Sequence, residues 1–223
     1  MDILLASHNK HKYEEIKNIL QKDVNLISLA DLKDFDEVIE DGQSFKDNSF
    51  IKAKYYYDKY KMNVISDDSG LSVNALGGAP GVYSARYSGN KANDLSNNLL
   101  LLKNMEDKTD RRAFFSSSIC YIEDGKEFFF EGILDGTIAL DIKGEHGFGY
   151  DPLFILSDGR RLSNLELNEK NKISHRAIAL AKWAYFMKKK VKDNEWSRCQ
   201  KKIWSDISWK ECWNRTSFIR WNE

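Results

Sequence analysis

Two adjacent carboxylates, Asp67 and Asp68, follow a short β-prone run at 63–66 that we expect to end there, and Ser69-Gly70 comes next. Crowded carboxylates repel each other unless a cation or a proton relieves the repulsion. A hard cation such as Mg²⁺ takes oxygen ligands and usually keeps waters and phosphate oxygens. With Glu40 alongside, the group could hold Mg²⁺, and a spare carboxylate could orient or deprotonate a water. The alternative is a solvated Asp-rich turn that caps the next element.

A run of donors and cations, Ser7-His8-Asn9-Lys10-His11-Lys12, lies between a predicted strand and a predicted helix. Free backbone N–H groups and the helix dipole favour an anion at such a helix N-terminus. Phosphate is the expected ligand, although the run lacks the glycine-rich P-loop pattern. The alternative is that Ser7 or Asn9 caps the helix while the lysines remain solvated.

Two separated segments combine aromatic, glycine and charged residues, namely Gly147-Phe148-Gly149-Tyr150-Asp151-Pro152 and Lys170-Asn171-Lys172-Ile173-Ser174-His175-Arg176. Aromatic rings flanked by glycines can offer flat surfaces to a nucleobase. Asp151 could accept a hydrogen bond from a base or a ribose. His175 and Arg176 could donate to a carbonyl oxygen, which would favour a 6-oxo purine over adenine. The alternative places the rings in the core and makes Ser174 the N-cap of the final helix.

The elements that must position these groups alternate between strand and helix, as in an α/β protein. Ile3-Leu4-Leu5-Ala6 predicts a buried strand. Apolar residues at helical spacing over 13–20 predict a helix whose opposite, polar face carries Glu14, Glu15 and Lys17.

A second helix is expected over 44–61, after the turn at Asp41-Gly42. Its expected buried face contains Phe45, Phe50, Ala53 and Tyr57. Two strands, 113–123 and 128–132, should form a hairpin about Asp124-Gly125. The remaining expected segments are a turn-rich loop at 77–89, a helix at 94–105, a strand at 136–142, a glycine-rich loop at 144–150 and a helix from 175 to about 190.

The composition is that of an ordinary globular protein. The 223 residues include 34 basic and 34 acidic ones, so the formal net charge is zero, which argues against bulk attraction to nucleic acid or anionic lipid. No apolar run approaches the roughly 20 residues of a membrane span, and the first residues lack a basic signal region. Cys120, Cys199 and Cys212 form no C-x-x-C pair, so a disulfide framework is not expected. We expect a cytoplasmic protein with no membrane partner.

The end of the chain differs from the rest. Every tryptophan lies at or after Trp183, and five of the six lie between Trp196 and Trp221. We expect a domain over residues 1–190 and a Trp-rich C-terminal extension over 191–223, an appended helix that packs on the domain or on a partner rather than a second catalytic domain. Trp196, Cys199, Ile203 and Ile207 could form a helical stripe there.

Five sequence blocks together resemble the Ham1-like family of inosine/xanthosine triphosphate pyrophosphatases. They are S-H-N-K-H-K at 7–12, E-D-G-Q-S-F-K-D-N-S-F-I-K-A at 40–53, S-D-D-S-G-L-S-V-N-A-L-G-G-A-P-G-V-Y-S-A-R-Y-S-G at 66–89, G-F-G-Y-D-P-L-F at 147–154 and E-K-N-K-I-S-H-R-A at 169–177. The blocks occur in the family's order and span nearly all of residues 1–190.

The resemblance implies a fold and an activity. The fold is a long, twisted, mixed β-sheet flanked by helices, with two lobes around a central cleft. The activity is Mg²⁺-dependent hydrolysis of ITP, dITP or XTP at the α–β phosphoanhydride, giving the monophosphate and pyrophosphate. The expected partners are a purine nucleoside triphosphate and a second copy of the chain, with no stable nucleic-acid binding.

The resemblance also implies roles for individual residues. Asp68 matches the catalytic carboxylate, which is also a Mg²⁺ ligand, and Glu40 matches the second metal-binding carboxylate. Residues 7–12 resemble the triphosphate-binding loop, and Lys52 and Arg86 resemble further phosphate contacts. Base and substrate contacts are implied at the other matching positions, which are Ser69, Phe148, Gly149, Tyr150, Asp151, Lys170, His175 and Arg176.

The chain departs from the family pattern in two segments, the first being Phe45-Lys46-Asp47-Asn48-Ser49. Asp47 stands where the family usually has the longer Glu, in F-x-E-N-A, and Ala177 replaces the glycine that usually follows His-Arg. The resemblance ends near residue 190.

Two other functions fit parts of the sequence. The related Maf-like pyrophosphatases act on other modified or pyrimidine nucleotides within a similar fold. A non-catalytic nucleic-acid-binding module would use the aromatic and basic tail, where cations alternate with rings that can stack on bases; these residues are Trp196, Arg198, Lys201, Lys202, Trp204 and Trp209.

Overall fold

We describe the protein from a computed structural model in which residues 1–20 and 24–205 are placed, with side chains described as far as residue 190. One compact unit spans Met1–Lys182 and a second begins at Trp183. The helices are α1 (Lys10–Leu20), α2 (Phe45–Tyr60), α3 (Asp94–Asn104), α4 (Leu167–Ile173) and α5 (His175–Ser205). The strands are β1 (Asp2–Leu5), β2 (Asn25–Ser28), β3 (Val64–Val73), β4 (Arg112–Glu123), β5 (Lys126–Ile138) and β6 (Phe154–Leu156).

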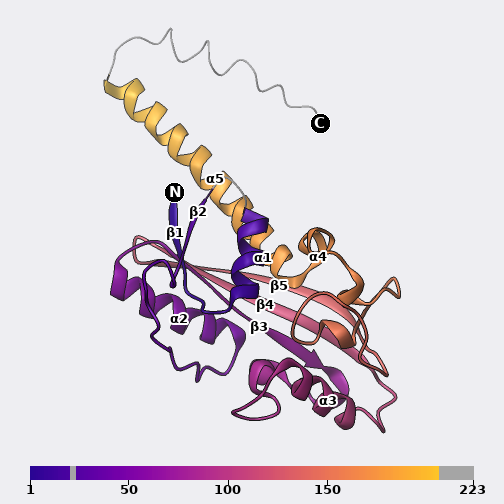
Figure 1. The fold of residues 1–223 in the computed structure, drawn as a ribbon. Coiled ribbons are helices and arrows are strands. Elements are labelled where there is room, and N and C mark those ends of the chain that lie inside the picture. Colours follow the sequence, from indigo (N-terminus) through magenta and orange to yellow (C-terminus); the bar gives the residue numbers. More distant parts are fainter. Residues whose placement is uncertain (21–23, 206–223) are drawn as a thin grey trace, which may run out of the picture. The chain divides into compact units, whose positions relative to one another are not determined.

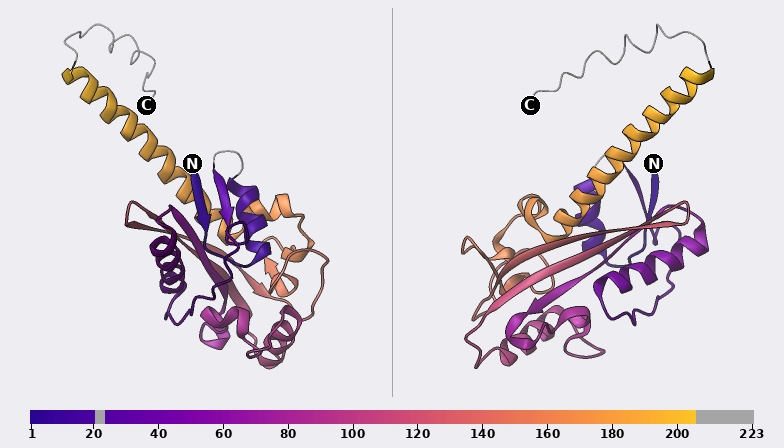
Figure 2. Two further views of the ribbon diagram at one scale, coloured as in Figure 1. Left: turned by 60° about the vertical axis from the view of Figure 1, so that its left-hand side comes forward. Right: turned by 180° about the vertical axis from the view of Figure 1, so that it is seen from behind.

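The strands of the first unit form one six-stranded sheet in the order β2-β1-β3-β4-β5-β6. β1 pairs in parallel with β2 and β3, and the other pairs are antiparallel. Helix α2 lies along one face of the sheet, and α1 and α4 lie over the other (Figures 1 and 2). The predicted class, a long mixed sheet with flanking helices, is confirmed.

Strand β1 forms where the sequence predicts it. Ile3, Leu4 and Leu5 are completely buried, because β1 has a parallel neighbour on each side and covered faces, as near-continuous apolar strands require. The chain then turns into α1, where Asn9 Oδ1 accepts a hydrogen bond from the Lys12 N–H at 3.1 Å and caps the helix.

Strand β3 corrects the expectation that the strand stops before Asp67. It runs to Val73, so both aspartates lie in mid-strand, with Asp67 opposite Ile119 of β4 and Asp68 opposite Ser118. Aspartate is disfavoured in strands by propensity, but cations from helices on both faces compensate these two carboxylates. The alternative of a solvated Asp-rich turn is therefore wrong.

Helix α2 packs through a more polar face than expected. Its buried residues are Asn48, Ser49, Lys52, Ala53 and Tyr56, and of the predicted apolar face only Ala53 is fully buried. The buried face is polar because the strand that it contacts, β3, also has a polar side chain there. Ser66 Oγ donates to the Ser49 carbonyl oxygen at 2.5 Å. Polar groups on the two elements satisfy each other inside the interface.

The predicted hairpin between β4 and β5 is confirmed, with Asp124 and Gly125 at φ values of 51° and 73°. Its second strand is longer than expected, since β5 continues without a break to Ile138. The expected separate strand at 136–142 is therefore wrong.

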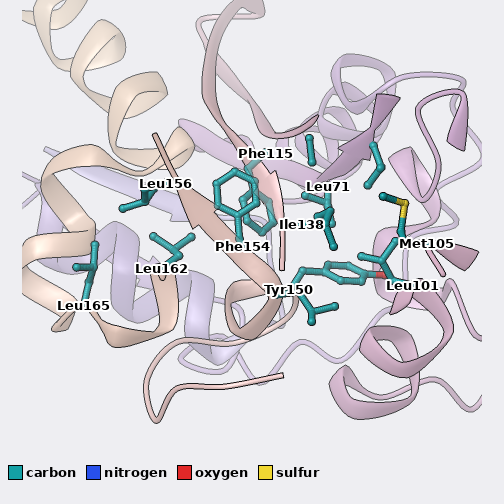
Figure 3. Close-up of a cluster of buried hydrophobic side chains, with 13 residues drawn as sticks. Leu71, Leu101, Met105, Phe115, Ile138, Tyr150, Phe154, Leu156, Leu162 and Leu165 are labelled. Atoms are coloured by element: carbon teal, nitrogen blue, oxygen red, sulfur yellow. The ribbon is translucent and has the colours of Figure 1, made fainter. Parts of the chain in front are cut away.

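An apolar cluster fills the space between the sheet and α3. Figure 3 shows Leu101 of α3 and Met105, which directly follows α3, beside Tyr150, with Leu71 nearby. All four side chains are buried. This cluster joins α3 to the loop that carries the aromatic motif, and it therefore helps to position a predicted site segment.

Within the second unit, α5 continues to Ser205, beyond the predicted end near 190. The side chains of the Trp196 stripe and residues 206–223 lie outside the described residues. None of the helices in the described part of the chain has both the length and the apolar character of a membrane span.

Candidate active site

The first unit contains a cavity of about 470 Å³, a volume typical of small-molecule sites. Its wall comes from segments far apart in the sequence, including the end of β1, mid-strand β3, the 148–151 loop and the start of α5. The predicted site residues that line it are Ser7, His8, Asn9, Lys12, Glu40, Lys52, Asp68, Ser69, Arg86, Phe148, Gly149, Tyr150, Asp151, Lys170, His175 and Arg176.

Lys52 brings the two predicted metal-binding carboxylates together. Its Nζ lies 2.7 Å from Glu40 Oε2 and 3.4 Å from Asp68 Oδ1. Burial raises the pKa of Asp68 above its ordinary value, because Lys52 and Lys12 offset only part of the lost hydration. A raised pKa makes this carboxylate a better proton acceptor near neutral pH.

The pair also fits a hard cation. Asp68 Oδ2 is buried and has no hydrogen-bond partner among the described residues, so it is a free oxygen ligand. No group of three or more His, Cys, Asp or Glu side chains in the described ranges gathers into a complete metal site. An ion at Glu40 and Asp68 would take its other ligands from water and phosphate, as Mg²⁺ usually does.

Asp67 lies in a separate, buried ion-pair network. Its Oδ2 lies 2.9 Å from Lys12 Nζ and 3.1 Å from Arg176 Nη2, and its Oδ1 accepts from Ser117 Oγ at 2.5 Å. Burial alone would raise the pKa of Asp67, but Arg176 and Lys12 hold it well below its usual range. Asp67 is thus an ionised structural carboxylate.

The 7–12 segment combines capping with cavity lining. Besides the Asn9 cap, Ser7 Oγ accepts from the Asn9 N–H at 3.2 Å, and His8 Nε2 lies 2.9 Å from the Asp36 carbonyl oxygen. Lys10 and His11 do not line the cavity. His11 instead stacks on Phe148, with ring centroids 5.1 Å apart.

Lys170, which also lines the cavity, organises the aromatic loop. Its Nζ lies 2.6 Å from Asp151 Oδ2 and 4.6 Å from the centre of the Phe148 ring. Asp151 Oδ2 also accepts from the Phe148 backbone N–H at 3.0 Å. Asp151 therefore contacts both its own loop, through the Phe148 N–H, and helix α4, through Lys170.

His175 and Arg176 are both buried at the start of α5, where Ser174 Oγ caps the helix. The His175 ring stacks on Phe115 at 4.9 Å, and its Nδ1 has no hydrogen-bond partner among the described residues. Burial, with a smaller contribution from Arg176, lowers the pKa of His175 well below its ordinary value, so the ring is neutral at pH 7 and retains one donor and one acceptor nitrogen.

The Arg176 guanidinium is largely committed to protein partners. Nε and Nη2 donate to Asp67, Nη2 also donates to Ser69 Oγ at 2.9 Å, and Nη1 donates to Glu15. Although Arg176 lines the cavity, its guanidinium is fixed between two carboxylates.

Comparison of the sequence with known proteins shows which family the chain belongs to. The model of the Ham1 family matches residues 3–186. The chain belongs to the Ham1 family. A dITP/XTP pyrophosphatase of Caldanaerobacter subterraneus subsp. tengcongensis is 43% identical over 197 residues, which cover 86% of this chain and 98% of that protein. One from Corynebacterium glutamicum (strain ATCC 13032) is 44% identical over 192 residues, covering 81% of this chain and 93% of the relative.

Solved structures of Ham1 proteins have the same fold. The Staphylococcus aureus Ham1 protein superimposes with a TM-score of 0.78 at 37% identity, covering 85% of this chain and all of that one. A Ham1 protein from Coxiella burnetii gives a TM-score of 0.79 at 34% identity, covering 85% and 99% of the two chains.

This Ham1 protein also contains functional candidates that sequence reasoning missed. Glu15 is only 2% exposed, although its helical spacing placed it on the polar face of α1. It pairs with Lys170 at 2.8 Å and with Arg176. Burial would raise the pKa of Glu15, but these two cations lower it. The helix pattern alone gave no signal for this burial, because both partners come from the far end of the domain.

Two further missed residues, Asp94 and Asn98, lie on α3. A sequence signal was available for Asn98, since Asn97 and Asn98 are adjacent in a helix interior, where asparagine is unfavourable. Both asparagines are buried, so each needs polar partners inside the protein.

Proposed function

We propose that this Ham1 protein hydrolyses non-canonical purine nucleoside triphosphates, namely ITP, dITP and XTP, to the monophosphate and pyrophosphate. Its relatives from Caldanaerobacter subterraneus and Corynebacterium glutamicum are named for dITP and XTP. The observation that carries the proposal is the convergence of Glu40, Lys52 and Asp68 on one cavity wall. Bound Mg²⁺, held by Glu40 and Asp68, would supply charge neutralisation on the phosphates.

The chain's own groups then act as follows. The buried Asp68 carboxylate, with its raised pKa, orients a water and accepts its proton. Lys52 keeps Glu40 and Asp68 at close range and adds positive charge beside the phosphates. The 7–12 segment offers backbone and side-chain donors at the N-terminus of α1 for the outer phosphates.

Base selectivity is assigned to His175, Arg176 and Phe148, which also line the cavity. Neutral His175 has a buried Nδ1 with no hydrogen-bond partner in the described part of the chain, so it can complete a hydrogen bond to the 6-oxo edge of the purine. Arg176 supports this role from its fixed position beside His175, and Phe148 offers the ring face. One mismatched polar contact costs about 1–3 kcal/mol, so several contacts must combine to exclude adenine strongly.

A metal titration tests the carboxylate assignment. Glu40→Gln should raise the Mg²⁺ concentration needed for half-maximal pyrophosphate release from ITP, because one anionic ligand is lost. Glu127→Gln, a change in strand β5 outside the cavity lining, is the matched control. An unchanged Mg²⁺ requirement in Glu40→Gln would contradict the assignment.

The proposal also includes assembly, location and domain limits. We propose a cytoplasmic homodimer whose activity resides in residues 1–190, with 191–223 as an extension. Light scattering on the full chain and on a chain ending at Lys190 would give both masses, and a monomeric full chain would contradict the dimer.

A further inference from the structure

Two side chains of helix α3 form hydrogen bonds with the backbone N–H and C=O of Gly149 in the aromatic loop. Asp94 Oδ2 accepts from the Gly149 backbone N–H at 2.7 Å, and Asn98 Nδ2 donates to the Gly149 carbonyl oxygen at 2.9 Å. The two side chains are four residues apart and therefore share one face of the helix. The bond to Asp94 is charge-assisted and hence stronger than a neutral one.

The same helix face also supports the next residue of the loop. Leu101 lies on the same face, and it packs with Met105, the residue directly after the helix, in one apolar cluster with Tyr150 (Figure 3). The Tyr150 hydroxyl donates to the Ser84 carbonyl at 2.8 Å. Two consecutive loop residues are thus fixed, one through its backbone by α3 and one through its side chain by the core.

Gly149 depends on these hydrogen bonds because it has no side chain to pack. Its φ of +63° is in the left-handed region that favours glycine. No heavy atom lies within 4 Å of where its Cβ would be. The two bonds from α3 therefore orient the peptide units that join Phe148 to Tyr150.

Those peptide units determine where the recognition groups point. Phe148 lines the cavity directly before Gly149, and Asp151 lines it two residues after. The Phe148 N–H bond to Asp151 Oδ2 closes this short loop. A rotation of the Gly149 peptide would therefore move both the Phe148 ring and the Asp151 carboxylate relative to a bound base.

We propose that Asp94 and Asn98 are positioning residues for nucleobase selectivity, acting through Gly149. The inference rests on the proposed function, because it concerns how the same cavity distinguishes a 6-oxo purine from adenine. It assigns α3 a role that none of the sequence motifs indicated. Asp94 also lines the cavity, but its positioning role depends on Oδ2, the oxygen that accepts the hydrogen bond from the Gly149 N–H.

The test compares steady-state kinetics on ITP and ATP in the full chain. Asp94→Ala and Asn98→Ala should each raise KM for ITP about three- to tenfold, the effect of one lost hydrogen bond, with kcat nearly unchanged. The ratio of kcat/KM for ITP to that for ATP should fall. Asp94→Asn should recover part of the ratio, because its amide oxygen can still accept from Gly149.

Two asparagines of the same helix region provide matched controls. Asn93 caps α3 by accepting from the Ser96 N–H, and Asn104 donates to the Tyr87 hydroxyl; neither side chain bonds Gly149. Asn93→Ala and Asn104→Ala should lower stability by similar amounts and leave the ITP/ATP ratio unchanged. If Asn93→Ala lowers the ratio as much as Asp94→Ala does, helix stability explains the effect and the proposal is overturned.

Amide hydrogen exchange gives a readout independent of catalysis. Gly149 should lose protection in Asp94→Ala and keep it in Asn93→Ala. A wild-type protein that hydrolyses ATP as well as ITP would overturn the proposed function. A selective wild type whose Asp94→Ala and Asn98→Ala variants remain equally selective would overturn only the positioning role.

Discussion

Asp67 and Asp68 are neighbours in the chain, yet their carboxylates bind partners on opposite faces of β3. Successive strand residues point to opposite sides, so Asp67 meets Lys12 and Arg176 while Asp68 meets Lys52 of α2. Their pKa values consequently shift in opposite directions, downward for Asp67 and upward for Asp68. Asp67 is held in a buried ion-pair network, whereas Asp68 keeps one oxygen, Oδ2, that has no hydrogen-bond partner within residues 1–20 and 24–190.

Asp68→Asn separates these roles. We expect pyrophosphate release from ITP to fall at least about a hundredfold, because a proton acceptor and a metal ligand are lost together. The unfolded fraction at pH 7 should not increase, since Asn has the same shape and removes a buried charge. Activity assays together with circular dichroism check both points, and full activity in a folded Asp68→Asn protein would contradict the assignment of the base.

Arg176→Ala should act mainly on stability. Removing this guanidinium leaves Asp67 and Glu15 buried with fewer counter-charges, and breaking such a network costs about 3–5 kcal/mol. Urea-induced unfolding measures the change. Arg176→Lys, which keeps the charge, should lose less. A stability equal to wild type in Arg176→Ala would show that the network contributes little.

His175 should make stability depend on pH in the acid range. Its pKa is depressed in the folded state, so below about pH 6.5 the unfolded chain binds a proton that the folded protein does not. Because of this group, the free energy of unfolding should then fall by up to about 1.4 kcal/mol for each unit by which the pH is lowered. Urea titrations between pH 5 and 7 on wild type and His175→Phe measure the slope, and identical slopes would rule out the contribution.

Asp34 should stabilise the segment that carries Glu40. Its side chain is buried and accepts from Lys59 Nζ and the Tyr60 hydroxyl, each at 2.6 Å. Burial would raise the pKa of Asp34, but these hydrogen bonds lower it to about 2. The stabilisation is therefore full above the ordinary pKa near 3.8 and is lost as pH falls through about 2.

Asp34→Asn should accordingly lower the free energy of unfolding by about 1–3 kcal/mol at pH 7. The difference from wild type should shrink between pH 4 and pH 2. Unfolding curves at several pH values provide the measurement, with exposed Asp107→Asn as the control. A constant difference across this range would contradict the ionic origin of the effect.

The sequence predicted which residues line the cavity far better than it predicted the strand bounds and ion pairs that position them. Glu40, Lys52 and Asp68 could be identified because they match short motifs whose types and spacing are characteristic of the Ham1 family. The end of the strand at Asp67 was wrong because local propensity does not include the cations that fold back onto β3. Those cations come from α1 and α5, at opposite ends of the domain.

Glu15, Asp94 and Asn98 illustrate what local patterns cannot show. Helical spacing marks Glu15 as a surface residue, and only the tertiary approach of Lys170 and Arg176 makes its burial favourable. Similarly, the hydrogen bonds of Asp94 and Asn98 to Gly149 join residues more than one element apart. Such roles follow from packing, which periodicity does not encode.

Pyrophosphate release measured on ITP, XTP, dITP, ATP and GTP, with and without Mg²⁺, decides whether the protein is a Mg²⁺-dependent pyrophosphatase selective for non-canonical purines. Release should require Mg²⁺ and should be at least about tenfold more efficient on ITP, XTP and dITP than on ATP, as one or more unpaired polar groups in the base pocket would give. Equal efficiency on ATP and ITP, or a preference for UTP, CTP or methylated nucleotides when these are added, would contradict the proposed selectivity for non-canonical purines.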